Sequence, residues 1–211
     1  SAASDVYKRQ VVLKEGNNNT VGGVVAQCTG EKIEKCTNTG NVISYSTNNF
    51  LQMGGICGLS NNTKLIECTN YGNITVKAEQ GDSYYVGGIS GVTVASVEGK
   101  STIDRCNNEG KVTGRGCVGG IVGSSYIGVT IKNCSNVNEV KGRAFLGGIV
   151  GMLGNTENKL SHSTLMECYN SGSITAYSEN DELTSSFGGI VGVINDKGRD
   201  CLLYTSDAAD D

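Results

Sequence analysis

Cysteine is the residue type of this 211-residue chain best suited to chemistry, because a thiol can act as a nucleophile, a metal ligand or half of a disulfide. Five of the nine cysteines open a repeated Cys-x-Asn motif, at Cys36, Cys68, Cys106, Cys134 and Cys168. The intervals of 28 to 38 residues between them match no pair of zinc ligands, and the chain has a single histidine. We therefore expect neither a metal nor a cofactor at these positions.

The five motif cysteines are expected to form a column of small buried thiols, since a free cysteine packs as a small hydrophobic residue. Disulfides between neighbouring members are the alternative, because paired strands lie about 4.8 Å apart and bridged Cα atoms about 4.4–6.8 Å apart. A column of five could not pair completely. The remaining three cysteines within the repeat are also expected to be packing residues: Cys28, Cys57 and Cys117.

Acid–base chemistry has few candidates in this sequence. His162, the one imidazole, lies in the polar segment LSHST, where an exposed loop residue is expected. Asp104 with Arg105 and Asp181 with Glu182 are the only pairs that suggest an enzyme. The residues before the motif cysteines alternate in charge over the first three units, which a solvated ladder of ion pairs explains. These residues are Lys35, Glu67, Arg105, Asn133 and Glu167. The sequence therefore predicts no enzyme.

Two blocks alternate along the chain and must position all of these residues. One reads VGGIVG at Val118, and the other reads CTNYGNI at Cys68. The first block occurs six times, with its glycine pairs at Gly22, Gly23, Gly54, Gly55, Gly87, Gly88, Gly119, Gly120, Gly147, Gly148, Gly188 and Gly189. Intervals of 28 to 41 residues between these pairs are typical of a solenoid, whose units bury a core only by stacking on one another.

The apolar positions of each unit favour strands over helices, because β-branched residues dominate them. In the second block Cys68, Asn70 and Gly72 fall two apart, so they share one face of an extended segment. The asparagines in this phase are expected to hydrogen-bond in a ladder between units: Asn38, Asn70, Asn108, Asn136 and Asn170. An apolar residue such as Ile103 lies three before each cysteine, and this odd spacing requires a corner between them. The predicted fold class is an all-β, parallel β-helix-like solenoid with variable loop inserts.

The glycines of the first block are interpreted as tight corners or close backbone approaches, because GGIVG lacks the spacing of a nucleotide-binding loop. Two units depart from the pattern. Ala26 replaces the third glycine of its block, and Asn138 replaces the glycine of the Cys block. A left-handed turn is expected at Asn138, since asparagine tolerates a positive φ. Polar inserts are expected to project from the coil at 93–100, 153–163 and 177–186.

This pattern resembles the GLUG-type repeat of bacterial surface proteins, which also occurs in IgA-protease-like peptidases. The resemblance covers nearly all of residues 11–200. It implies a secreted or cell-surface solenoid that serves as a stalk or an adhesive region, and it does not imply peptidase activity. The expected partners are neighbouring repeats of the parent protein and a host glycan or protein. A carbohydrate-binding or carbohydrate-cleaving β-helix is the alternative function.

The composition excludes two classes of partner. The net charge of −4 gives no electrostatic reason to expect nucleic acid. No apolar run is long enough to cross a membrane, so direct membrane insertion is not expected.

The two ends of the chain resemble a transposase-type sequencing adapter, because codons for one end give the other when read from the opposite strand. We therefore expect adapter-like tags at 1–10 and 201–211 and an array of about six units at 11–200. The tags are unrelated to the repeat and are not expected to pair with it. An array without capping units is expected to fray and to associate end to end.

Overall fold

The computed structural model describes residues 10–15, 18–47, 50–77, 84–96, 100–126, 128–154, 163–177 and 186–195, together with the backbone of 202–204. Within these residues the chain forms strands and turns and no helix. The strands lie in five sheets, and neighbours in each sheet are parallel. The predicted class, an all-β solenoid, is therefore confirmed.

We number the sheets I to V in the order in which each coil visits them. Sheet I contains β2 (Asn19–Gly22), β7 (Leu51–Gly54), β12 (Tyr84–Gly87), β17 (Cys117–Gly119), β22 (Phe145–Gly147) and β27 (Ser186–Gly188). Sheet II contains β3 (Val25–Thr29), β8 (Cys57–Asn61), β13 (Ser90–Val94), β18 (Val122–Ser125), β23 (Val150–Leu153) and β28 (Val191–Ile194). Sheet III contains β4 (Lys32–Glu34), β9 (Lys64–Ile66), β14 (Ser101–Asp104), β19 (Val129–Lys132), β24 (Thr164–Met166) and β29 (Leu202–Tyr204).

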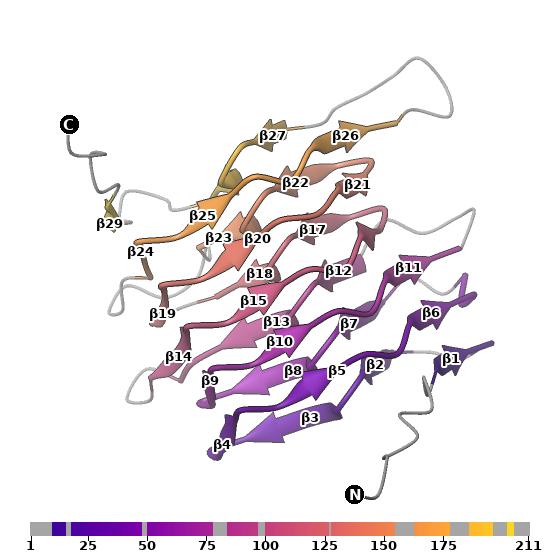
Figure 1. Ribbon diagram of the computed structural model, residues 1–211, viewed down its shortest axis with the longest axis horizontal. Helices are drawn as coiled ribbons and strands as arrows, with labels where there is room; N and C mark the ends of the chain where they lie inside the picture. Colours follow the sequence, from indigo (N-terminus) through magenta and orange to yellow (C-terminus); the bar gives the residue numbers. More distant parts are fainter. Residues whose placement is uncertain are drawn as a thin grey trace, which may run out of the picture.

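Sheet IV contains five short strands: β5 (Thr37–Asn38), β10 (Thr69–Asn70), β15 (Asn107–Asn108), β20 (Ser135–Asn136) and β25 (Tyr169–Asn170). Sheet V contains β1 (Val11–Leu13), β6 (Val42–Ser44), β11 (Ile74–Val76), β16 (Val112–Thr113), β21 (Val140–Gly142) and β26 (Ile174–Ala176). One complete coil runs from β2 to β6, and the same order repeats up to β26. Figure 1 shows the coils stacked from the indigo N-terminal end to the orange C-terminal end.

Equivalent residues of successive units lie directly opposite one another, as the repeat predicts. Gly22 pairs with Gly54, and Gly54 with Gly87. Because the register is constant, each position of the repeat becomes a column that runs along the stack. The varying intervals in the sequence are therefore absorbed between strands and do not shift the columns.

The interior contains two separate hydrophobic clusters. One lies inside sheets II, III and IV and includes the residues three before each motif cysteine: Ile33, Leu65, Ile103, Ile131 and Leu165. The other lies inside sheets I and V and includes Met53, Val86 and Val118 from sheet I. Most of these side chains are fully buried in the middle coils. Burial of such apolar surface is the main stabilising contribution, at about 25 cal/mol for each Å².

The predicted corner before each motif cysteine is present and has an unusual backbone. The residues just before the cysteines have φ values of 50° to 54°: Lys35, Glu67, Arg105, Asn133 and Glu167. Residues other than glycine rarely adopt this left-handed backbone region. We infer that stacking of the coils imposes the corner and that the local preference of these residues does not. Asn138 was predicted to take a positive φ, and this prediction is wrong, because the left-handed non-glycine positions do not include it.

The predicted inserts begin and end differently from the expectation. Thr93 and Leu153 still belong to β13 and β23, and Ser186 already belongs to β27. Residues 97–99 of the first insert and the greater part of the other two lie outside the described residues. The expectation that the C-terminal tail would not pair is also wrong, because the backbone of β29 pairs with β24 at the edge of sheet III. An open edge offers backbone donors and acceptors to any extended segment, whatever its relation to the repeat.

Candidate functional site

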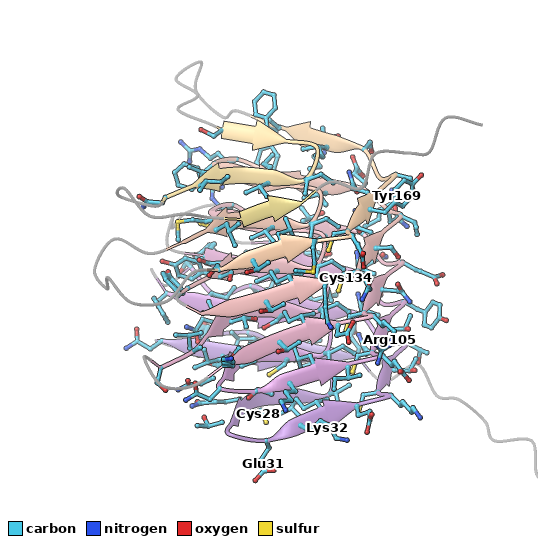
Figure 2. All side chains as sticks on the ribbon, turned by 90° about the vertical axis from the view of Figure 1, so that its left-hand side faces the viewer. Cys28, Glu31, Lys32, Arg105, Cys134 and Tyr169 are labelled. Carbon is cyan, nitrogen blue, oxygen red and sulfur yellow. The ribbon has the colours of Figure 1, made fainter. Side chains whose placement is uncertain are left out.

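The motif cysteines form a column of free thiols between sheets III and IV. Cys68, Cys106 and Cys134 are buried, and each thiol donates to the carbonyl oxygen two residues earlier in the chain, at 3.1 Å for Cys134 to Lys132 O. Figure 2 shows Cys134 inside the stack and Tyr169 on its outer edge. The other three described cysteines, Cys28, Cys57 and Cys117, are free as well.

Burial suppresses the nucleophilic form of three of these thiols, those of Cys57, Cys117 and Cys134. It raises the pKa of Cys57 to about 12 and the pKa of Cys117 to about 12. Burial likewise raises the pKa of Cys134, and the neighbouring thiol of Cys106 adds to the effect. A thiol with a raised pKa is almost entirely protonated near neutral pH, so it reacts slowly. Cys57, Cys117 and Cys134 therefore fit packing better than nucleophilic chemistry.

The motif asparagines form the predicted ladder, and its direction is the same at every step. Asn38 Nδ2 donates to Asn70 Oδ1 at 2.7 Å, and Asn70 Nδ2 donates to Asn108 Oδ1 at 2.8 Å. The same bond continues from Asn108 to Asn136 at 2.7 Å and from Asn136 to Asn170 at 2.8 Å. Each Nδ2 also donates to the carbonyl oxygen two residues later, such as Gly110 O at 2.7 Å for Asn108. These bonds satisfy amides that are otherwise fully buried in the middle coils.

The glycine pairs lie on the opposite wall of the coil and face this ladder at close range. A Cβ on Gly23 would lie 2.7 Å from Asn38 Cγ, which is shorter than any real contact. In the following coils, Cβ atoms at the second glycine would likewise meet the ladder asparagine and a backbone carbonyl: Gly55, Gly88, Gly120 and Gly148. At the first glycine of each pair a Cβ would meet the carbonyl three residues later: Gly22, Gly54, Gly87, Gly119, Gly147 and Gly188. The two blocks of the repeat therefore meet in space and separate the two hydrophobic clusters.

The structure shows how one departure from the repeat, Asn138, is accommodated. Gly72 and Gly110 allow close approach to the backbone of the preceding coil, at Gly40 and Gly72 respectively, without a positive φ. Asn138 has a Cβ at this position, and its Nδ2 donates to Glu109 O of the preceding coil at 2.9 Å. Ala26 lies in the first complete coil and is exposed.

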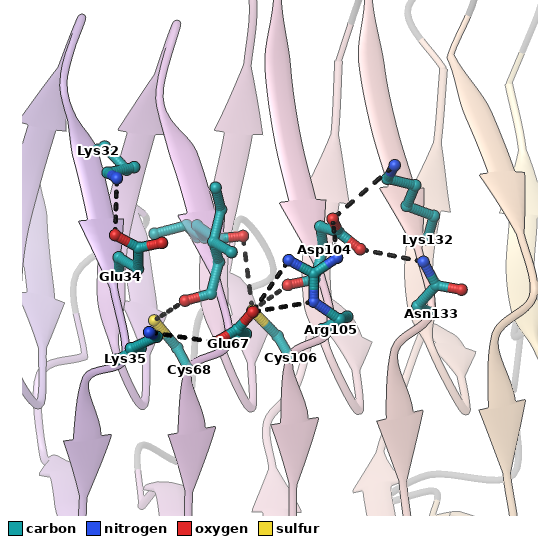
Figure 3. A network of polar contacts seen from close by, with 12 residues as sticks. Lys32, Glu34, Lys35, Glu67, Cys68, Asp104, Arg105, Cys106, Lys132 and Asn133 are labelled. Carbon is teal, nitrogen blue, oxygen red and sulfur yellow. Dashed lines mark hydrogen bonds and ion pairs between the residues drawn. The ribbon is translucent and has the colours of Figure 1, made fainter.

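The charged residues around Asp104 form a network that joins this buried carboxylate to partly exposed basic side chains. Arg105 contacts Glu67 at 3.0 Å and Asp104 at 2.8 Å. Asp104 is also 3.8 Å from Lys132 Nζ and accepts a hydrogen bond from Asn133 Nδ2 at 3.0 Å. Figure 3 shows this network crossing neighbouring coils, with Lys35 3.9 Å from Glu67. The carboxylates of Glu67 and Asp104 are therefore paired with basic side chains. The pairs of Glu67 with Lys35 and Arg105 are those of the predicted charge ladder.

Several candidate residues lie outside the described residues, namely His162, Asp181, Glu182 and Cys201. Within the described ranges, no group of three or more His, Cys, Asp and Glu side chains could hold a metal ion. The part of the chain that the structure describes also contains no helix long and apolar enough to cross a membrane.

Three aromatic rings gather where sheets I and II pass near one another, a feature that the sequence analysis missed. Phe50, just before β7, packs edge-on against Tyr85 of β12, with ring centroids 5.9 Å apart. Tyr85 also packs edge-on against Tyr126, which follows β18, at 6.4 Å. Burial raises the pKa of Tyr85, and its interaction with Tyr126 adds to the shift. We call Phe50, Tyr85 and Tyr126 the aromatic group. Successive members of the aromatic group are about 40 residues apart in sequence, so their proximity can be recognised only when the register of the coils is known.

The fold and the columns define a β-solenoid repeat protein, with parallel strands and an internal asparagine ladder. Comparisons with protein-family models, with curated proteins and with solved structures found no match for this chain.

Proposed function

We propose that this chain is a non-catalytic repeat module of a bacterial cell-surface or secreted protein, in which the solenoid acts as a structural stalk and as an adhesin. The observation that carries the proposal is the contrast between the inside and the outside of the stack. The interior asparagine column keeps one residue type, as Asn70 and Asn108 do, whereas an outward position changes from Glu67 to Arg105. A constant interior with a variable exterior suits a scaffold that presents surface to partners.

Two further observations support the proposal. The continuous parallel sheets and the ladder bind each coil to the next, which suits a rod that transmits force along its axis. The Gly-Gly and Cys-x-Asn blocks resemble the GLUG-type repeat of bacterial surface proteins, in which such arrays lie outside the cell.

The test is surface labelling of cells that produce the parent protein, with an antibody raised against residues 11–200. Labelling of intact cells is the expected outcome, with removal of the epitope by an added protease. Labelling that requires lysis would exclude a surface role. The purified chain should also release no sugars from a panel of polysaccharides, and turnover of any of them would overturn the non-catalytic part of the proposal.

A second candidate function, carbohydrate binding, is favoured by the aromatic group alone. Aromatic side chains present large apolar faces at low conformational cost, and the apolar face of a sugar ring packs against such a surface. Binding to a glycan array should be lost in Tyr126→Ala. The matched control is Tyr71→Ala, because Tyr71 is exposed but lies in another part of the coil. Equal binding by both variants would remove the aromatic group as a glycan site.

A further inference from the structure

The motif cysteines of the middle coils form a row of soft ligands inside the stack. Cys68, Cys106 and Cys134 are at most 1% exposed. The strand pairs on either side of them, in sheets III and IV, are in register, so each cysteine lies directly opposite the next. Figure 3 shows Cys68 and Cys106 in this relation on neighbouring coils. The row therefore offers pairs of sulfur atoms that are protected from water.

The three thiols have the same orientation in their coils. Each lies near a carbonyl oxygen of the preceding coil: Cys68 3.7 Å from Ile33 O, Cys106 3.6 Å from Leu65 O and Cys134 3.7 Å from Ile103 O. Because this contact repeats, the sulfur atoms are related by the same translation as the strands, which is about 4.8 Å. The thiols of Cys106 and Cys168 both contribute to the raised pKa of Cys134, in agreement with a sulfur on either side of it.

This spacing is too wide for a disulfide but fits a metal ion between two sulfurs. Side chains stacked in register on parallel strands keep their Cβ atoms about 4.8 Å apart, whereas the Cβ atoms of a disulfide lie about 3.5–4.5 Å apart. A bond from a thiolate sulfur to a metal ion such as zinc is about 2.3 Å long, so an ion on the line between two sulfurs spans about 4.6 Å. The coils therefore need not move to hold such an ion.

We propose that neighbouring motif cysteines bind copper(I), a soft monovalent ion, in two-coordinate thiolate sites along the column. Thiolate is a ligand that selects copper(I). An ion that enters between two cysteines displaces the proton of one thiol, and the thiolate so formed bonds to the ion. One positive charge replaces another, so the net charge of the interior does not change. This balance is important because an uncompensated charge is costly among apolar side chains such as Leu65 and Ile103.

The low number of ligands separates this site from a zinc site. The intervals between the motif cysteines exclude zinc, which takes four ligands in structural sites. Within the described ranges no group of three or more His, Cys, Asp and Glu side chains could hold a metal ion, but an ion with two ligands does not need such a group. A sulfur in the middle of the column, such as that of Cys106, bridges two ions, one on each side.

The experiment incubates the full 211-residue chain, without oxygen, with copper(I) supplied as its coloured complex with bicinchoninate. The loss of colour counts the ions that the protein takes from the chelator, and the release of protons is followed in the same sample. The wild type should take up copper(I) and release one proton for each ion. X-ray absorption of the loaded protein should show two sulfur neighbours for each copper.

Single cysteine variants test whether the ions lie between members of the column. Cys106→Ala removes the sulfur shared by two intervals, so it should bind two ions fewer than the wild type. Cys68→Ala combined with Cys106→Ala removes three intervals, so it should bind three ions fewer. The matched control is Cys117→Ala, which removes a buried thiol of sheet I, outside the column, and should leave the uptake unchanged. Circular dichroism checks that each variant is folded.

The outcomes that would overturn the proposal are distinct. No uptake by the wild type would overturn it, as would copper with neighbours other than two sulfurs. The latter measurement needs no variant and therefore decides the matter even if Cys106→Ala fails to fold. A loss of one ion in each single variant, Cys117→Ala included, would show that the thiols bind copper independently and would also overturn it.

Discussion

Replacement of Asn108 by alanine should break the asparagine ladder in the middle of the stack. Asn108 is fully buried, donates to Asn136 Oδ1 and to Gly110 O, and accepts from Asn70 Nδ2. The substitution removes these three hydrogen bonds and leaves buried groups on the neighbouring coils without a partner. At about 1 kcal/mol for each lost bond, we expect the free energy of unfolding to fall by about 3 kcal/mol.

The measurement is urea unfolding followed by far-ultraviolet circular dichroism. The matched control is Asn107→Ala, one residue earlier, where the side chain is half-buried and accepts one bond from Ser135 Oγ at 2.8 Å. This control should lose less than about 1 kcal/mol. Asn170→Ala should fall between the two, because water can reach the half-buried Asn170 and satisfy the freed groups. Equal unfolding midpoints for Asn108→Ala and Asn107→Ala would refute the ladder as a source of stability.

Three further predictions concern the glycines and the thiols. Gly88→Ala should lower the free energy of unfolding by about 1–3 kcal/mol through overpacking, whereas Gly189→Ala, at the same motif position with no atom within 4 Å, should change it little in thermal melts. A reductant should leave the melting temperature unchanged, because the eight described cysteines are free, and a large drop would reveal bridges between coils. Stability should fall as the pH rises above about 9, because the unfolded chain releases the protons of Cys57 and Cys117 while the folded chain keeps them until about pH 12. Each such thiol lowers the free energy of unfolding by up to about 1.4 kcal/mol per pH unit in this range. The free energies of unfolding measured by denaturation at pH 8 and pH 10 should therefore differ less in Cys57→Ala than in the wild type.

The sequence predicted the columns better than the corners. Period two placed Asn70 on one face with Cys68, and a constant register then turned that face into the observed ladder. The odd spacing from Ile103 to Cys106 required a corner, and the structure has one at Arg105. Its left-handed backbone could not be predicted, because neither arginine nor glutamate favours that region. Stacking of the coils overrides the local preference there.

Two parts of the site were out of reach of local reasoning. The prediction for Asn138 was wrong because the glycine at that position provides close approach to the preceding coil, and not a positive φ. The meeting of Gly88 with Asn108 was missed because about 20 residues and several corners separate them. The one signal in the sequence for this contact was that the Gly-Gly pair and the motif asparagine occur together in each full unit. The pairing of β29 with β24 depends on an open edge, which no sequence pattern displays.

The uniform direction of the asparagine ladder has a consequence for how such an array can change in length. Every unit presents one amide donor toward the C-terminal neighbour and one amide acceptor toward the N-terminal neighbour, as Asn70 and Asn108 do. Duplication or deletion of a whole unit leaves this arrangement intact, because the new neighbours again meet as donor and acceptor. A lineage can therefore lengthen or shorten the rod by recombination between units without creating an unpaired amide inside it. Recombination at a point within a unit, between the glycine pair and its asparagine, does not preserve this arrangement.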